Sequence, residues 1–142
     1  MDRFYGGISS DPVNVRVQQV SEALFGTAPA VGALLARDGG QAAGIASWSY
    51  LWPAVGLTRS LYLKELYVAE SHRRRGVGRL LMQAVFEAAR EQRCSRVEWT
   101  TETDNAGARA FYHQLGLPVH PSKVFYRVEG TGAGMPPIRD QS

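Results

Sequence analysis

The sequence predicts a mixed α/β domain in which at least one helix crosses over a β-sheet. Two observations carry this prediction. Asp38 and Gly39 begin a turn between two apolar runs, residues 30–37 and 42–52, which is the pattern of a β-hairpin. A strand-like segment at residues 60–70 is then followed by a glycine-containing turn and a segment of helical periodicity. Strand, turn and helix in this order are typical of a crossover connection.

The expected elements follow one another without an internal repeat. They are a helix over 13–25, strands over 30–37, 42–52 and 60–70, a helix over 77–93, a strand over 96–101, a helix from Asp104 or Asn105 to Leu115, and a last strand over 123–128. The helix over 77–93 has an apolar face made by Leu81, Ala84, Val85 and Ala88. Gly116 supplies a helix stop. Residues 1–129 are expected to form one domain, and the Gly- and Pro-containing residues 130–142 a mobile tail.

Composition indicates a soluble globular protein. The 142 residues are 44% hydrophobic and 20% charged, and no apolar run approaches the roughly 20 residues that span a bilayer. The first twenty residues lack the apolar run of a signal peptide, so we expect a cytoplasmic location and no membrane partner. Cys94 is the only cysteine, which excludes an intrachain disulfide and a cysteine-based metal cluster, and we expect it to be a small buried residue rather than a nucleophile.

Positive charge gathers at the turn that follows the strand over 60–70. Arg73, Arg74 and Arg75 stand beside Gly76 and Gly78, and the chain as a whole carries a formal net charge of +3. Backbone amides at the start of a helix, with the helix dipole behind them, favour an anion. A plain glycine-rich turn is the alternative, and a nucleic-acid surface is disfavoured because no aromatic stacking residues are interleaved with the arginines.

Three motifs make the resemblance to a known family specific. Arg73-Arg74-Arg75-Gly76-Val77-Gly78 matches the Arg/Gln-x-x-Gly-x-Gly/Ala signature of the GNAT acetyltransferase superfamily. Tyr62 to Val68 resembles its central strand, and Asn105 through Phe111-Tyr112 to Leu115-Gly116 resembles its later helix. The resemblance covers roughly residues 30–128. It implies the GNAT fold, shortened at its N-terminus, and an N-acetyltransferase that uses acetyl-CoA.

The resemblance also implies which residues hold acetyl-CoA. The amides of residues 74–79 would bind the pyrophosphate, and a bulged, splayed strand would let Leu66 and Val68 pair with the pantetheine, with the Val68 amide polarising the acetyl carbonyl. The residues expected to contact the co-substrate are Leu66, Tyr67, Val68, Arg73, Arg74, Arg75, Gly76, Val77, Gly78, Arg79 and Asn105. No metal is expected.

Two residues are candidates for acid–base chemistry. Glu65 lies in an otherwise apolar strand and could accept the ammonium proton as a general base; its alternative is an ordinary outward-facing strand residue. Tyr112 could donate a hydrogen bond to the departing thiolate; its alternative is a core tyrosine.

The acceptor amine is less closely defined. Tyr62-Leu63-Lys64-Glu65-Leu66 is similar to the Tyr-Leu-Glu-Asp-Leu of spermidine/spermine acetyltransferases, but Lys64 would repel a polycation. Glu98 and Glu102 could attract a single ammonium group. The alternative function is a catalytically silent acyl-CoA-binding module. Because few residues precede the helix over 13–25, a sheet edge or helix surface is expected to be uncovered, and a homodimer is expected to cover it.

Overall fold

The computed structural model of the chain describes residues 14–16 and 31–140. The chain divides into two compact units, Met1–Ala106 and Gly107–Ser142. Within the described ranges, no helix is both long enough and apolar enough to cross a membrane.

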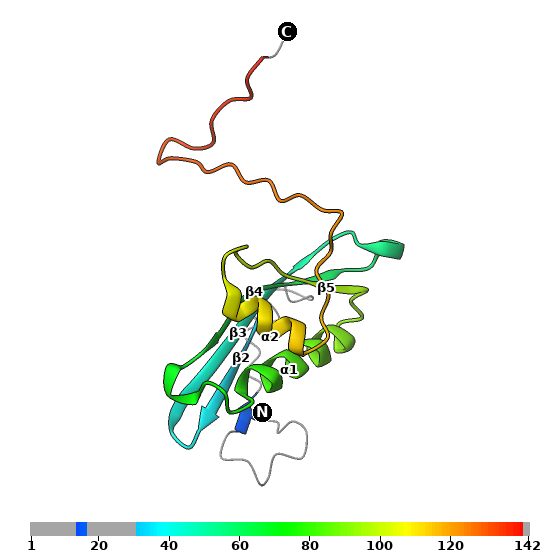
Figure 1. Cartoon of the computed structure of the whole chain (residues 1–142). Helices are drawn as coiled ribbons and strands as arrows, with labels where there is room; N and C mark the ends of the chain where they lie inside the picture. The colour runs from blue at the N-terminus through cyan, green and yellow to red at the C-terminus, as the bar shows by residue number, and fades with distance from the viewer. Residues whose placement is uncertain (1–13, 17–30, 141–142) are drawn as a thin grey trace. The chain divides into compact units, whose positions relative to one another are not determined.

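The first unit is built on a mixed sheet whose spatial order follows the chain (Figure 1). In the described residues its strands are β1 (Asn14–Arg16), β2 (Val31–Asp38), β3 (Gln41–Leu51), β4 (Ser60–Val68) and β5 (Arg96–Glu98). Pairing is antiparallel from β1 to β4, and β5 runs parallel to β4. The predicted parallel crossover and the mixed α/β class are therefore confirmed.

The β2–β3 hairpin has the predicted turn. Asp38 pairs with Gln41, which leaves Gly39 and Gly40 as the two central residues. Gly39 has φ 59°, a backbone conformation that glycine adopts without steric cost. A short 3-10 turn, Val55–Leu57, joins β3 to β4.

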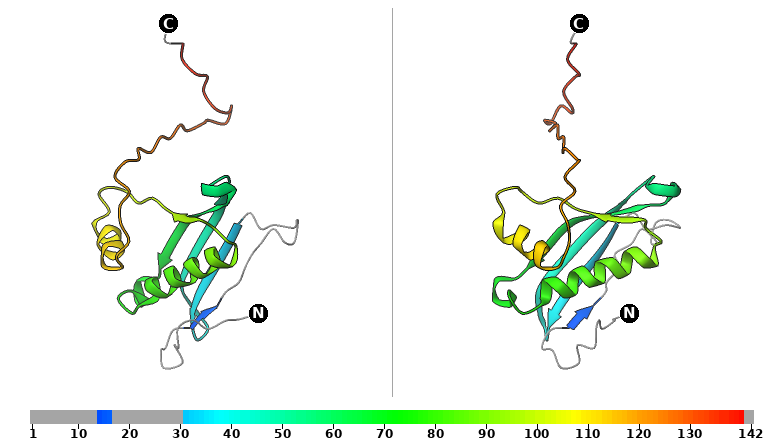
Figure 2. Two further views of the ribbon diagram at one scale, coloured as in Figure 1. Left: turned by 90° about the vertical axis from the view of Figure 1, so that its right-hand side faces the viewer. Right: turned by 45° about the vertical axis from the view of Figure 1, so that its right-hand side comes forward.

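Helix α1 (Val77–Glu91) connects β4 to β5 along the chain. It lies on one face of the sheet, where it packs mainly against β4, β3 and β2 (Figure 2). Its buried residues are Val77, Leu81, Met82, Ala84, Val85, Ala88 and Ala89. They include the whole apolar face that the sequence predicts. They pack with Leu34, Ala36, Ala46, Leu61 and Leu63 of the sheet to form the core of this unit.

A glycine in β3 lets α1 approach the sheet closely. A Cβ built on Gly44 would lie 2.8 Å from the Tyr67 carbonyl oxygen, 3.0 Å from Leu81 and 3.2 Å from Val77. Because the nearest of these atoms belongs to the backbone, a side chain at this position cannot be accommodated by a rotamer change alone. The position of the helix N-terminus over the end of β4 therefore depends on Gly44.

Helix α2 (Ala106–Gln114) begins at the boundary between the two units. All of it except Ala106 belongs to the second unit, together with the chain that follows. The helix stop is as predicted: Gly116 has φ 74°, its amide donates to the His113 carbonyl at 2.9 Å, and the Leu117 amide donates to the Tyr112 carbonyl at 3.0 Å. These two bonds form a Schellman motif.

Three predicted elements differ from the structure. Residues 123–128 do not form a strand; Val124, Phe125 and Tyr126 are exposed, and apolar alternation makes a strand only where a neighbouring backbone pairs with it. The strand over 96–101 ends at Glu98. Of the helix over 13–25, residues 14–16 form a strand paired with β2, so the helical spacing was misleading there, and the remaining residues lie outside the described part of the chain.

The close approach at Gly44 gives a stability prediction. Gly44→Ala is expected to lower the free energy of unfolding by about 1–3 kcal/mol, because overpacking forces the backbone or α1 to shift. Gly40→Ala is the control, since a Cβ there meets nothing within 4 Å. Urea denaturation checks both; equal stability of the two variants would show that α1 is not held this closely.

Candidate functional site

A β-bulge lies in the second half of β4. Ser47 of β3 pairs with Glu65, but the next residue, Trp48, pairs with Leu63, so Lys64 is the extra residue. A bulge interrupts the strict alternation of side chains between the two faces. Lys64 and Glu65 are accordingly both exposed.

The other side of β4 is unpaired beyond the bulge. Pairing with β5 involves only Ser60, Leu61 and Tyr62, and the last pair is Tyr62 with Glu98. Beyond it the Tyr62 hydroxyl lies 3.3 Å from Thr100 Oγ1. Within the ranges that the structure describes, Leu63 and residues 65–68 therefore pair with β3 alone, which is the splay that the resemblance implies.

The direction of the backbone groups on β4 follows from one hydrogen bond. The Ala69 amide donates to the Ala43 carbonyl at 2.8 Å and so points toward β3. In a strand, the amide and the carbonyl of one residue point to the same side, and those of the next residue point to the other side. The amides of Leu66 and Val68 consequently point away from β3, toward the unpaired side. The Val68 carbonyl agrees with this direction, because it accepts a hydrogen bond from Arg73 Nε at 3.1 Å.

The glycine turn joins this strand to α1. A 3-10 turn, η4 (Glu70–His72), follows β4, and Arg74 and Gly76 then take positive φ values of 61° and 79°. The first helical hydrogen bond runs from the Leu80 amide to the Gly76 carbonyl at 3.0 Å. The amides of residues 77–79 precede it and have no partner within the helix, as is general for a helix N-terminus. Gly76 is the N-cap and has no side chain to accept from them.

The side chains of the turn fall into two groups. The Val77 side chain is 1% exposed and belongs to the core, so only its backbone can meet a ligand. Arg73, Arg74, Arg75 and Arg79 are all exposed. Arg73 folds back along β4, where its guanidinium lies 5.9 Å from the centre of the Tyr67 ring. The turn thus combines unpaired amides with positive charge, an arrangement that suits a phosphate group.

Glu65 has a partner that the sequence analysis missed. The Ser47 hydroxyl donates to Glu65 Oε1 at 2.9 Å across the β3–β4 pair. Ser47 interrupts the apolar run of residues 42–52, but the sequence alone does not show that it lies opposite Glu65. The pair orients the carboxylate while leaving it in contact with solvent.

The acidic residues expected near the amine are not equivalent. Glu98 Oε1 accepts a hydrogen bond from the Ser60 hydroxyl at 2.6 Å, and Ser60 is only 3% exposed. Part of the Glu98 carboxylate is thus used to satisfy a buried hydroxyl. Glu102 is exposed in the loop after β5, and its carbonyl accepts from the Asn105 amide at 3.0 Å.

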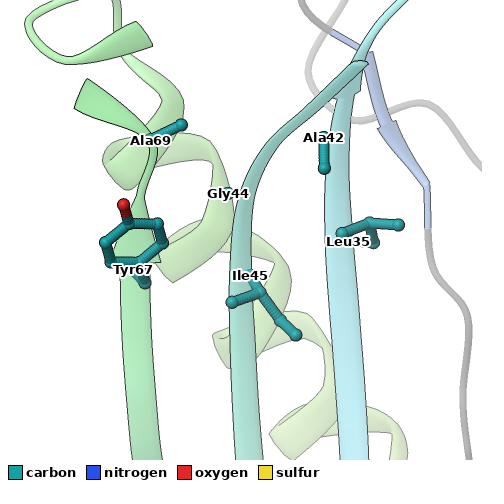
Figure 3. A pocket seen from close by; sticks show the side chains of 6 residues that line it. All are labelled: Leu35, Ala42, Gly44, Ile45, Tyr67 and Ala69. Carbon is teal, nitrogen blue, oxygen red and sulfur yellow. The ribbon is translucent and has the colours of Figure 1, made fainter. Parts of the chain in front are cut away.

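A shallow apolar pocket of about 250 Å³ lies near the end of β4 (Figure 3). It is lined by Leu35, Ala42, Gly44, Ile45, Tyr67 and Ala69. Tyr67 supplies its one polar side chain. The pocket offers apolar surface next to the start of η4 and no acidic or basic group for catalysis.

Tyr112 lies on α2 in the second unit. It is half-buried, and its ring makes an edge-to-face contact with Phe111 at 5.1 Å between centroids. Burial raises the pKa of the Tyr112 phenol above its ordinary value of 10.0, so the hydroxyl is protonated at neutral pH. Asn105 directly precedes the helix, the position expected of a cap.

Cys94 is not activated as a nucleophile. Burial raises the pKa of its thiol, and the positive charge of Arg59 only partly opposes that shift. In the described residues, no group of three or more His, Cys, Asp or Glu side chains could hold a metal ion.

Comparison with known proteins identifies the family of this chain. The model of the Acetyltransferase (GNAT) family matches residues 4–117, which is most of the chain. The chain therefore belongs to the GNAT acetyltransferase family. It is 32% identical over 79 residues to L-ornithine N5-acetyltransferase NATA1 of Arabidopsis thaliana, an alignment that covers 56% of this chain and 35% of that protein.

Two solved structures resemble the fold. An integron cassette protein from the mobile metagenome of V. cholerae has a TM-score of 0.69 and 32% identity, with 74% of this chain and 65% of that one covered. Aminoglycoside N-acetyltransferase AAC(6')-Iy in complex with CoA has a TM-score of 0.63 and 25% identity, with 72% of this chain and 78% of that one covered. The chain spans about a third of the length of the curated relative and just under two thirds of the cassette protein.

The burial of Tyr112 gives a titration prediction. The Tyr112 phenol is expected to ionise at a pH above the ordinary tyrosine pKa of about 10, because burial disfavours its anion. The Tyr112→Phe variant lacks this phenol and serves as the reference. Phenolate absorbance against pH, taken as the difference between wild type and variant, measures it. Tyr126→Phe is the control, since that ring is 87% exposed. A difference curve for Tyr112 centred at or below the ordinary value would contradict the burial of this side chain.

Proposed function

We propose that this chain transfers an acetyl group from acetyl-CoA to a primary amine. The observation that carries the proposal is the unpaired side of β4, which leads directly into the glycine turn and the N-terminus of α1. Extended backbone with free amides suits the amide groups of pantetheine, and the turn suits a pyrophosphate. Membership of the family and the CoA complex of a similar structure support the same co-substrate.

Binding of acetyl-CoA would use backbone more than side chains. The amides of Leu66 and Val68 are aimed at the unpaired side and would meet the pantetheine and the acetyl carbonyl. The amides of residues 77–79, with the exposed Arg74, Arg75 and Arg79, would meet the pyrophosphate. A Cβ on Gly76 would meet nothing within 4 Å, so the space in front of the turn is open.

Glu65 would act as the general base. Attack on the thioester needs a neutral amine, so a base must receive the ammonium proton directly or through water. The hydrogen bond from Ser47 holds Glu65 in one orientation, which favours this role over that of an unconstrained surface carboxylate. Tyr112 would donate a hydrogen bond to the departing thiolate, and its raised pKa keeps the donor proton in place.

The acceptor would be a small amine rather than a polyamine. Lys64 is exposed beside Glu65, and its charge would oppose a substrate that carries several ammonium groups. Two similar proteins, an ornithine N5-acetyltransferase and an aminoglycoside N-acetyltransferase, support nitrogen as the acceptor atom. A cytoplasmic location and a homodimer stay predictions.

An assay of CoA release tests the function. The purified chain is given acetyl-CoA and a panel of amino acids, monoamines, diamines and aminoglycosides, and free thiol is measured. We expect amine-dependent release with at least one primary amine. Binding of CoA without release across the panel would favour the silent acyl-CoA-binding module instead, and no binding would exclude both functions.

The turn gives a first prediction from this proposal. Gly76→Val is expected to weaken CoA binding at least 10-fold, because a β-branched residue is strained at φ 79° and the turn must rearrange. Gly56→Val is a matched control: Gly56 also has a positive φ, 67°, and a Cβ there also meets nothing within 4 Å. Calorimetric titration with CoA checks both. Similar affinities for the two folded variants would remove the turn from the binding site.

The base gives a second prediction. Glu65→Gln is expected to lower kcat/KM most at low pH, where the amine is protonated, and the loss is expected to shrink as the pH approaches the pKa of the amine. Ser47→Ala keeps the carboxylate but removes its donor, so a smaller loss is expected. Glu129→Gln, an exposed carboxylate of the second unit, is the control. A Glu65→Gln enzyme with the pH profile of the wild type would show that another group takes the proton.

A further inference from the structure

A buried histidine outside the proposed catalytic groups links the hairpin to the glycine turn. His72 is the last residue of η4 and is 4% exposed. Its Nε2 lies 3.0 Å from Asp38 Oδ2, and its Nδ1 lies 2.9 Å from Ser71 Oγ. Both ring nitrogens therefore have partners, as buried polar groups require. Asp38 ends β2, at the tip of the β2–β3 hairpin.

This pair fixes a segment that would otherwise be held mainly by short-range bonds. The His72 amide donates to the Ala69 carbonyl at 2.8 Å, and the Arg73 amide donates to the Glu70 carbonyl at 3.3 Å. Both bonds are local to η4. The Asp38–His72 bond joins residues 34 positions apart and ties η4 to a different part of the sheet.

The turn that follows needs such support. Arg74 is not a glycine, yet it has φ 61°, and Gly76 follows with φ 79°. A non-glycine residue persists in the left-handed region only where the surrounding structure determines its conformation. Val77 anchors the turn from its helix side, because it is 1% exposed in the core. His72 is the corresponding buried anchor on the strand side.

We propose that Asp38 and His72 are positioning residues that hold the turn in the geometry needed to bind the CoA pyrophosphate. The inference rests on the proposed function and adds to it a pair of residues that do not touch the co-substrate. Asp38 acts through His72, and His72 acts through the backbone of residues 73–76. A change in the pair should consequently alter CoA affinity and leave the chemistry of acetyl transfer nearly unchanged.

Three variants test the pair. Asp38→Ala removes the acceptor, His72→Phe fills the ring volume without either nitrogen, and Asp38→Asn keeps an oxygen that can accept from Nε2. Because loss of a hydrogen bond to a charged group weakens an equilibrium by roughly 10-fold or more, we expect about that rise in the KM for acetyl-CoA and in the Kd for CoA with the first two variants. We expect kcat at saturating acetyl-CoA to change by less than about 3-fold, and Asp38→Asn to restore most of the affinity.

The double variant separates an acting pair from two independent residues. Asp38→Ala combined with His72→Phe is expected to raise the Kd for CoA no further than either single change does, because one interaction is removed in all three proteins. Additive losses would overturn the proposal. If Asp38→Ala or His72→Phe fails to fold, Asp38→Leu or His72→Leu takes its place, since each also removes the Asp38–His72 hydrogen bond.

The outcomes distinguish this inference from the proposed function. A wild-type chain that does not bind CoA overturns both. A wild-type chain that binds CoA, with folded variants of lower melting temperature but equal affinity, overturns the positioning role alone, because the pair would then serve only stability. Ser71→Ala is the last control: unchanged kcat is expected, and loss of turnover with normal CoA affinity would mean that the hydroxyl takes part in the chemistry instead.

Discussion

Backbone amides and carbonyls that have no neighbouring strand need other hydrogen-bond partners, and the second half of β4 has such groups along one side. The bulge at Lys64 and the end of β5 pairing at Tyr62 together leave one side of the strand without a neighbour over the described residues. Side chains at these positions could be exchanged for others, but the orientation of the Leu66 and Val68 amides follows from the register alone. The proposed binding of pantetheine rests on this feature.

The glycine turn extends the same surface because the core places α1 at the end of β4. Gly44 allows Val77 and Leu81 to approach the sheet, so the helix N-terminus lies beside the last residues of the strand. Arg73 binds the Val68 carbonyl at 3.1 Å, and Asp38 holds His72 from the hairpin. Strand end, turn and helix start are therefore fastened to one another by packing, by a side chain and by a buried polar pair.

Local chemistry predicted much of this arrangement. The hairpin follows from Asp38-Gly39-Gly40, α1 from its apolar spacing, and the end of α2 from Gly116, because each signal acts over a few residues. The splay and the bulge were implied by family resemblance. Residues 123–128 and 14–16 were mispredicted because their state depends on whether a distant strand pairs with them.

The site shows the same division between local and distant signals. The turn, Glu65 and Tyr112 could be singled out from motifs, but Ser47 beside Glu65 and Asp38 beside His72 could not, since each pair joins different strands or turns. The separation of 34 residues between Asp38 and His72 leaves no pattern in the sequence. Only the register of the sheet brings these partners together.

The most direct measurement of the central claim is an amide-resolved NMR titration of the isotopically labelled chain with CoA. We expect the largest shifts at two places, the amides of Leu66 and Val68 and those of residues 77–79, with saturation at one common CoA concentration. The outward face of the sheet at Leu35 and Ile45 should change little. Shifts confined to that face, or an unchanged spectrum for β4 while CoA binds elsewhere, would contradict the claim that the unpaired side of β4 and the turn form one binding surface.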